Sequence, residues 1–121
     1  MRVALVVDDN DLSQALLKRI LEGLDLSVIV TSNAHDGIRL AREINPAIIF
    51  MDVHLPGAGL DGLAATRALK DDPSTQQIPV VVMTAGACPD ESAGCKESRG
   101  DAFFRKPFSV QSLIQCIQAL T

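Results

Sequence analysis

Five short strand-like segments, separated by segments with a helical apolar pattern, constrain the fold of this chain more than any other feature. The strand-like segments are Val3–Val7, Ser27–Thr31, Ala47–Met51, Ile78–Met83 and Asp101–Arg105. Strands that alternate with helices are typical of βα units built around a parallel sheet. Ala47–Met51 is wholly apolar, as expected when helices cover both faces of a strand. Ser27–Thr31 is short and flanked by polar residues, which indicates an edge strand.

Four residues are well placed to begin helices, because their side chains can accept a hydrogen bond from the backbone of the first turn. These candidate N-caps are Asn10, Asn33, Asp61 and Ser109. One further helical segment, residues 86–100, is the weakest, since it contains Pro89 and Gly94. Glycine inside a helix costs about 1 kcal/mol relative to alanine, so we expect this element to be short, distorted or mobile.

The size and composition of the chain suit one domain over residues 1–121, with 47% hydrophobic and 21% charged residues. A formal net charge of −4 argues against direct binding of nucleic acid. The chain has neither an apolar run long enough to span a membrane nor an N-terminal signal-peptide pattern, which predicts a cytoplasmic protein without membrane contact. Cys88, Cys95 and Cys116 form no CxxC pair and are expected to be reduced thiols.

Polar residues follow four of the strand-like segments, and the carboxyl ends of parallel strands line one crevice where ligands bind. These residues are Asp8 and Asp9, Asp52, Thr84 and Lys106. Two carboxylates 4 Å apart repel by about 4 kcal/mol at an effective dielectric near 20, so three of them favour recruitment of a cation. Oxygen ligands, few in number, favour Mg²⁺. We expect Asp9 and Asp52 to bind Mg²⁺ directly, Asp8 to assist through water, and the backbone carbonyl of His54 to add an oxygen.

The same residues suit phosphoryl chemistry. A carboxylate such as Asp52 can attack phosphorus and form an aspartyl phosphate. Lys106 would offset charge on the phosphoryl oxygens, and the Thr84 hydroxyl would donate a hydrogen bond to one of them. Each residue also has an ordinary structural interpretation: a helix cap for the aspartates, a local backbone contact for Thr84, and a surface turn for Lys106–Pro107.

Taken together, five motifs resemble the receiver domain of bacterial two-component response regulators over essentially the whole chain. They are Val6–Asn10, Phe50–Gly57, Asp61–Gly62, Val82–Ala85 and Phe103–Phe108. The resemblance implies a flavodoxin-like (βα)5 fold, an α/β doubly wound parallel five-stranded sheet of order 2-1-3-4-5. It also implies that the phosphohistidine of a sensor histidine kinase or phosphotransfer protein phosphorylates Asp52, while Asp8 and Asp9 organise Mg²⁺.

The resemblance further implies a conformational switch that alters binding of a downstream protein or output domain. Thr84 would move toward the phosphoryl group, and the aromatic ring of Phe103 would turn inward into the space that it leaves. Phe103 is equally well explained as a core residue. Because it has no hydroxyl, we expect it to prefer the buried rotamer more strongly than tyrosine would. Such a domain catalyses only its own phosphorylation and dephosphorylation, and we expect a monomer or weak homodimer.

Some departures from the family pattern leave alternatives open. The loop over residues 55–62 is two residues longer than the usual motif, Gly86 offers no side chain to shield a phosphoryl group, and His54 can face either the attacking water or solvent. A receiver-like docking module that acts without phosphorylation is therefore the main alternative function. An aspartyl phosphatase or a flavodoxin fits less well, because the chain lacks a second acidic residue two positions after Asp52 and a phosphate loop after the first strand. Since Thr121 closes the last helix, the sequence is compatible with a free-standing regulator or with a segment of a longer protein.

Overall fold

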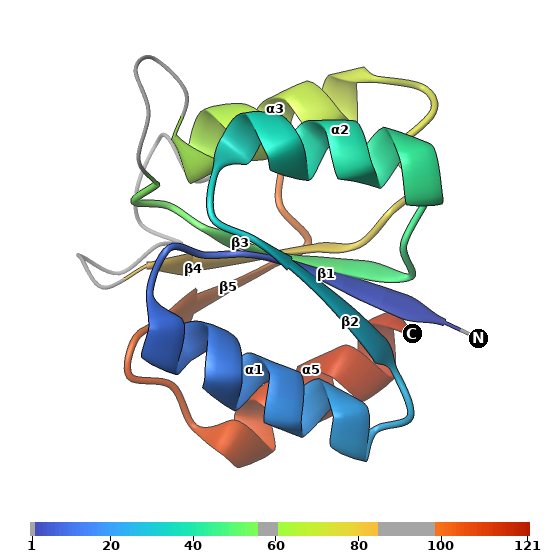
Figure 1. Cartoon of the computed structure of the whole chain (residues 1–121). Coiled ribbons are helices and arrows are strands. Elements are labelled where there is room, and N and C mark those ends of the chain that lie inside the picture. Colours follow the sequence, from blue (N-terminus) through green and yellow to red (C-terminus); the bar gives the residue numbers. More distant parts are fainter. Residues whose placement is uncertain (1, 56–60, 85–98) are drawn as a thin grey trace.

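The computed structural model describes residues 2–55, 61–84 and 99–121, which form a sheet between two layers of helices (Figure 1). The elements in chain order are β1 (Val3–Val7), α1 (Asp11–Gly23), β2 (Ser27–Thr31), α2 (Ala34–Ile44), β3 (Ile48–Asp52), α3 (Gly62–Asp71), β4 (Val80–Thr84), β5 (Ala102–Arg105) and α5 (Val110–Leu120). Most of the weak helical segment expected over residues 86–100 lies outside the described residues.

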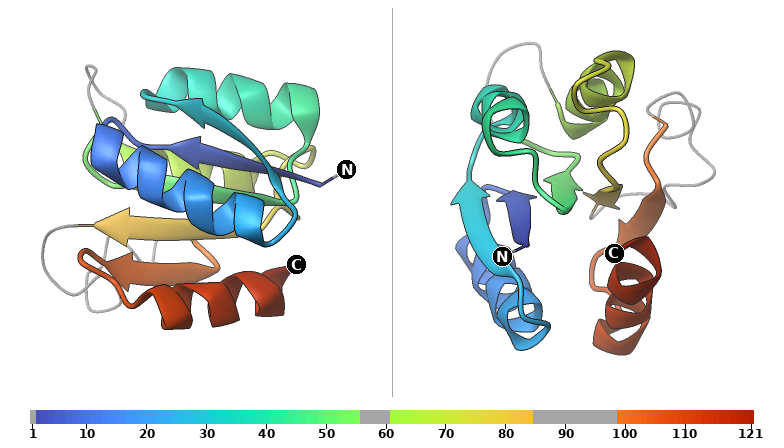
Figure 2. Two further views of the ribbon diagram at one scale, coloured as in Figure 1. Left: turned by 60° about the horizontal axis from the view of Figure 1, so that its bottom comes forward. Right: turned by 90° about the vertical axis from the view of Figure 1, so that its right-hand side faces the viewer.

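The five strands are all parallel and lie in the order β2-β1-β3-β4-β5. This order confirms the doubly wound α/β fold. Helices α2 and α3 cover one face of the sheet, and α1 and α5 cover the other (Figures 1 and 2). The two ends of the chain meet beside the amino ends of the strands, where Arg2 donates a hydrogen bond to the carbonyl of Thr121 at 3.2 Å. The opposite side of the sheet, formed by the carboxyl ends of the strands and called the carboxyl edge below, therefore lies away from both termini.

Two strands begin and end later in the sequence than predicted. β3 spans Ile48–Asp52 rather than Ala47–Met51, because Asp52 still pairs with Met83 of β4. β4 begins at Val80, directly after a proline that has no N–H to donate, and extends to Thr84. Asp52 and Thr84 are thus the last residues of their strands, and the ladder of backbone hydrogen bonds fixes their positions.

The core consists of one buried cluster on each face of the sheet. All residues of the central strands β3 and β4 are buried, which agrees with their continuous apolar sequence. β2 is an edge strand, as predicted, and none of its residues is fully buried. Side chains of β1, β3 and β4 alternate between the cluster under α2 and α3 and the cluster over α1 and α5.

All four predicted N-caps are confirmed, because each cap side chain accepts a hydrogen bond from the backbone N–H three residues later. The pairs are Asn10 with Ser13, Asn33 with Asp36, Asp61 with Ala64, and Ser109 with Ser112. Each cap fixes where its helix begins, and all four helices begin beside the carboxyl ends of the parallel strands that precede them. Within the described part of the chain, no helix is both long and apolar enough to cross a membrane.

Candidate functional site

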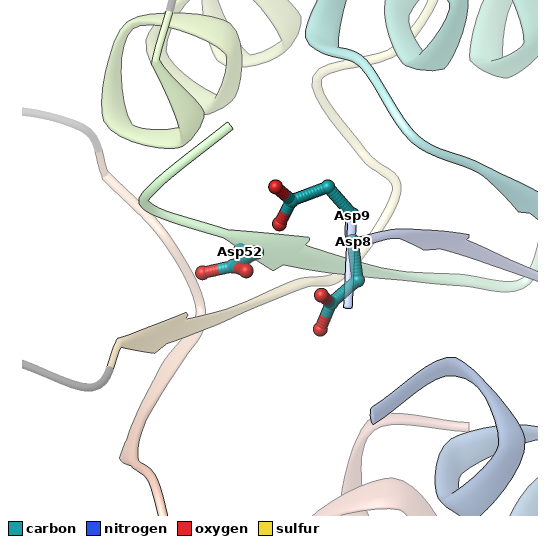
Figure 3. Close-up of side chains that lie close together, drawn as sticks. All are labelled: Asp8, Asp9 and Asp52. Atoms are coloured by element: carbon teal, nitrogen blue, oxygen red, sulfur yellow. The ribbon is translucent and has the colours of Figure 1, made fainter. Parts of the chain in front are cut away.

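Three aspartates meet at the carboxyl edge of the sheet. Asp8 and Asp9 directly follow β1, Asp52 ends β3, and each offers a carboxylate oxygen within 4.8 Å of the others (Figure 3). Asp8 is 1% exposed and Asp52 7% exposed, whereas Asp9 lies at the surface. The neighbouring, hydrogen-bonded strands β1 and β3 position these residues.

Lys106 brings a positive charge into this cluster from the segment after β5. Its Nζ donates to Oδ2 of Asp8 at 2.9 Å and to Oδ2 of Asp52 at 3.4 Å. Its backbone N–H donates to the carbonyl of Thr84 at 2.6 Å, which ties the segment to the end of β4. With 18% of its side chain exposed, Lys106 is a mostly buried cation paired with two buried carboxylates.

The surroundings of Asp52 raise its pKa, because the carboxylate is buried beside a second carboxylate. Burial raises the pKa of Asp52 above 3.8, and the nearby charge of Asp8 raises it further. Lys106 and the backbone N–H of His54 act in the opposite direction but do not outweigh these effects. For Lys106, burial alone would lower the pKa, but its hydrogen bonds and charge interactions with Asp8 and Asp52 raise it above 10.5. The lysine is therefore a fixed positive charge at neutral pH.

The other predicted site residues lie around this cluster. Thr84 is 5% exposed at the end of β4, one position beyond the residue that pairs with Asp52. The backbone N–H of His54 donates to Oδ1 of Asp52 at 3.2 Å, while the His54 side chain is exposed. Phe103 lies in the middle of β5, partly buried, and packs against the core cluster under α2 and α3. The expected preference of Phe103 for a buried rotamer stays a prediction.

Gly62, the first residue of α3, belongs to one of the sequence motifs, but the motif alone did not show what this glycine does at the site. Its backbone N–H donates to the carbonyl of Val53 at 2.9 Å, so α3 begins directly against the end of β3. A Cβ added to Gly62 would lie only 1.9 Å from the carbonyl oxygen of Asp52. Only glycine allows this approach without moving one of the two backbones. The Asp61–Gly62 pair carries the signal in the sequence: a helix cap followed by a residue without a side chain.

Ser13 of α1 is the second such residue. Its Oγ accepts a hydrogen bond from Nζ of Lys106 at 3.2 Å. The sequence showed no sign of this contact, because Ser13 and Lys106 are 93 positions apart. Ser13 and Lys106 also line a surface pocket of about 420 Å³ whose other walls are largely apolar, formed by Leu12, Leu16, Pro107 and Phe108.

A buried carboxylate at a strand end, two further acidic residues and a paired lysine define the class of site that binds a cation beside a transferred phosphoryl group. Comparison with known proteins places the chain within one family of this class. The model of the response regulator receiver domain matches residues 4–118. Polar-differentiation response regulator DivK of Brucella anthropi is 34% identical over 115 residues, which cover 95% of this chain and 92% of the relative.

Solved structures give the same result. The receiver domain of a signal transduction histidine kinase from Syntrophus aciditrophicus has a TM-score of 0.89 and 28% identity, covering 99% of this chain and 89% of that chain. The receiver domain of a sensor histidine kinase from Pseudomonas aeruginosa, solved with a magnesium ion coordinated in its active-site cleft, has a TM-score of 0.87 and 26% identity. That comparison covers 98% of this chain and 96% of the other.

This chain belongs to the response regulator receiver domain family. It is a phosphoacceptor signalling domain of a two-component system. Both the recognition of the family from sequence motifs and the predicted flavodoxin-like fold are confirmed.

Proposed function

We propose that Asp52 is the residue that accepts the phosphoryl group. An oxygen of its carboxylate attacks phosphorus while the bond between phosphorus and the histidine nitrogen of the donor breaks, and the imidazole leaves with the bonding pair. The observation that carries this assignment is the position of Asp52: it ends the central strand β3, lies within 4.8 Å of two other carboxylates and accepts a hydrogen bond from Lys106. Asp9 is exposed, and Lys106 lies closer to Asp8, at 2.9 Å, than to Asp52, at 3.4 Å, so Asp52 is the buried carboxylate that the lysine holds less closely.

The residues present fit Mg²⁺, because the cluster offers only oxygen ligands and has an excess of negative charge. Asp8, Asp9, Asp52 and the backbone carbonyl of His54 are the groups that would hold it. When bound, Mg²⁺ neutralises charge on the phosphoryl oxygens and on the carboxylates themselves. The magnesium ion in the related receiver domain from Pseudomonas aeruginosa supports this proposal.

Lys106 and Thr84 respond to the phosphoryl group in this proposal. The ammonium of Lys106 is already within hydrogen-bond distance of Asp52, so it can pair with a phosphoryl oxygen after a small movement. Thr84 ends the neighbouring strand β4 and supplies a hydroxyl donor. Its movement would leave space for Phe103, whose ring packs beside Val82 and Gly100. A switch of this kind needs two states that differ by only a few kcal/mol.

Acetyl phosphate with Mg²⁺, followed by intact-protein mass spectrometry, tests the assignment of Asp52. The wild-type chain should gain one phosphoryl group, and Asp52→Asn should gain none. Asp25→Asn is the matched control, because Asp25 is exposed in the turn after α1 and its φ of 64° is a conformation that asparagine tolerates. Phosphorylation of Asp52→Asn at the wild-type level would show that another residue accepts the group.

The partners in this proposal are a sensor histidine kinase or phosphotransfer protein as donor and a downstream protein or output domain as receiver of the signal. The apolar pocket beside Lys106 supports a protein donor, since a surface for docking lies next to Asp52. We propose a cytoplasmic monomer or weak homodimer that catalyses only its own phosphorylation and dephosphorylation. The alternative, docking without phosphorylation, rests on the longer loop over residues 55–62 and on the weak helical segment over residues 86–100, most of which lie outside the described residues. Equal partner binding by wild type and Asp52→Asn would favour it.

A further inference from the structure

The ammonium of Lys106 has three side-chain partners, and one of them is uncharged. It donates to Asp8 at 2.9 Å, to Asp52 at 3.4 Å and to the hydroxyl of Ser13 at 3.2 Å. The two carboxylates belong to the acidic cluster that a cation would bind. Ser13 does not belong to that cluster, so its interaction with Lys106 does not compete directly with cation binding.

The backbone holds Ser13 in place independently of Lys106. Ser13 is the third residue of α1, and its backbone N–H donates to Oδ1 of Asn10 at 3.0 Å, which is the N-cap bond of the helix. The side chain is partly buried between α1 and the segment after β5. By contrast, a lysine side chain has many rotamers, and the hydrogen bonds of its ammonium determine where the charge lies.

We infer that Ser13 is a positioning residue for Lys106. When Asp8 and Asp52 are engaged by a divalent cation or by the phosphoryl group, the Ser13 hydroxyl keeps the ammonium beside Asp52. This inference rests on the proposed role of Lys106 in phosphorylation. Ser13 acts only through Lys106, and its hydroxyl contacts neither the phosphoryl group nor the cation.

The test compares Ser13→Ala with Ser13→Thr in phosphorylation by acetyl phosphate. Ser13→Ala should lower the maximal rate by about fivefold, the amount expected for one hydrogen bond, and leave the Mg²⁺ concentration for half-maximal rate within about twofold of wild type. Ser13→Thr keeps the hydroxyl and should restore most of the rate. Ser112→Ala is the matched control, since Ser112 is also the third residue of its helix, donates its N–H to the N-cap and is exposed in α5.

A double-mutant cycle separates this role from a structural one. In a Lys106→Met background, Ser13→Ala should change the remaining rate by less than about 1.5-fold, because the group through which Ser13 acts is gone. An equal loss with and without Lys106 would overturn the inference and indicate a structural role. If Lys106→Met itself leaves the rate unchanged, the proposed role of Lys106 fails as well, so the two failures are distinguishable.

A second measurement needs neither metal nor phosphodonor. In protein labelled with ¹⁵N and treated with EDTA, the ammonium protons of Lys106 can be followed by NMR, and the chain has only three other lysines, Lys18, Lys70 and Lys96. Loss of the Ser13 hydroxyl should speed exchange of these protons with water or broaden the signal beyond detection. If the ammonium protons of Lys106 exchange as slowly in Ser13→Ala as in wild type and in the control Ser112→Ala, the contact with Ser13 does not restrain Lys106 and the inference is refuted.

Discussion

The contact between Gly62 and the backbone of Asp52 leads to a quantitative prediction for Gly62→Ala. The added Cβ would lie 1.9 Å from the carbonyl oxygen of Asp52, 2.6 Å from its carbonyl carbon and 2.8 Å from Cα of Val53. Non-bonded carbon atoms prefer separations of about 3.5 Å or more, so α3 and the end of β3 must separate by roughly 1 Å. All three contacted atoms belong to the backbone, and no side-chain rotation can relieve the overlap.

The expected cost follows from this overlap. Overpacking in a close-packed interior costs about 1 to 3 kcal/mol, and a clash with backbone places Gly62→Ala near the upper end, at about 3 kcal/mol. With an unfolding entropy of about 2.1 cal/mol/K per residue over 121 residues, this cost lowers the melting temperature by about 12 °C. Because the shift moves Asp52, the rate of phosphorylation by acetyl phosphate should also fall, by roughly tenfold to a hundredfold.

Thermal unfolding by circular dichroism measures the first effect, and intact mass at timed intervals measures the second. Gly23→Ala is the matched control, because no atom lies within 4 Å of a Cβ added at Gly23, at the end of α1. This control should melt at the wild-type temperature or slightly above it. A melting temperature for Gly62→Ala within about 2 °C of that control would refute the argument that the close approach of α3 fixes the position of Asp52.

Three further outcomes follow from the charged groups. The pKa of Asp52 is raised in the folded state. Its contribution to folding stability is therefore most favourable below pH 3.8, and this contribution is lost as the pH rises through the pKa of the folded state. In EDTA, Asp52→Asn should therefore be more stable than wild type at pH 7, with a smaller advantage at pH 4, as thermal melts at both values would show. Mg²⁺ at about ten times its dissociation constant should raise the melting temperature of wild type by about 5 °C and leave Asp52→Asn nearly unchanged; equal shifts would contradict a site that includes Asp52. Lys70→Met should cost about 2 kcal/mol in urea unfolding, because the mostly buried ammonium donates to the carbonyl of Ile78 at 2.8 Å and to Asp101 at 2.7 Å. Arg39→Ala, which removes only exposed ion pairs, should cost less than about 0.5 kcal/mol, and equal costs would refute the distinction.

The fold was predictable because its signals are local and agree with one another. A continuous apolar run such as Val80–Met83 suits only a strand covered on both faces, and an N-cap such as Asn10 or Ser109 fixes the start of a helix. The residues at the strand ends were predictable for a related reason. In a parallel sheet, Asp8 and Asp52 must lie at the same edge once their strands are adjacent, whatever the details of the loops.

Contacts between distant segments were not predictable in this way. The hydrogen bond of Lys106 to Ser13 depends on how α1 packs against the segment after β5, and the approach of Gly62 to Asp52 depends on the path of the chain between β3 and α3. Strand boundaries also differed from the prediction: β3 and β4 end one residue later because the ladder continues to Asp52 and Thr84, and β4 begins two residues later, directly after Pro79. Neither effect leaves a periodic pattern in the sequence.

The arrangement of charges explains why one site can both bind a divalent cation and respond to a phosphoryl group. Three ionised carboxylates and one ammonium leave an excess of two negative charges, which equals the charge of one divalent cation. Without that cation, burial and the charge of Asp8 raise the pKa of Asp52. Lys106 alone cannot neutralise the cluster, and its partners Asp8 and Asp52 are carboxylates that the proposed cation site would share. In the proposed site, a cation held by Asp8 and Asp52 would weaken their hydrogen bonds to Lys106, and the ammonium would then be free to pair with a phosphoryl oxygen.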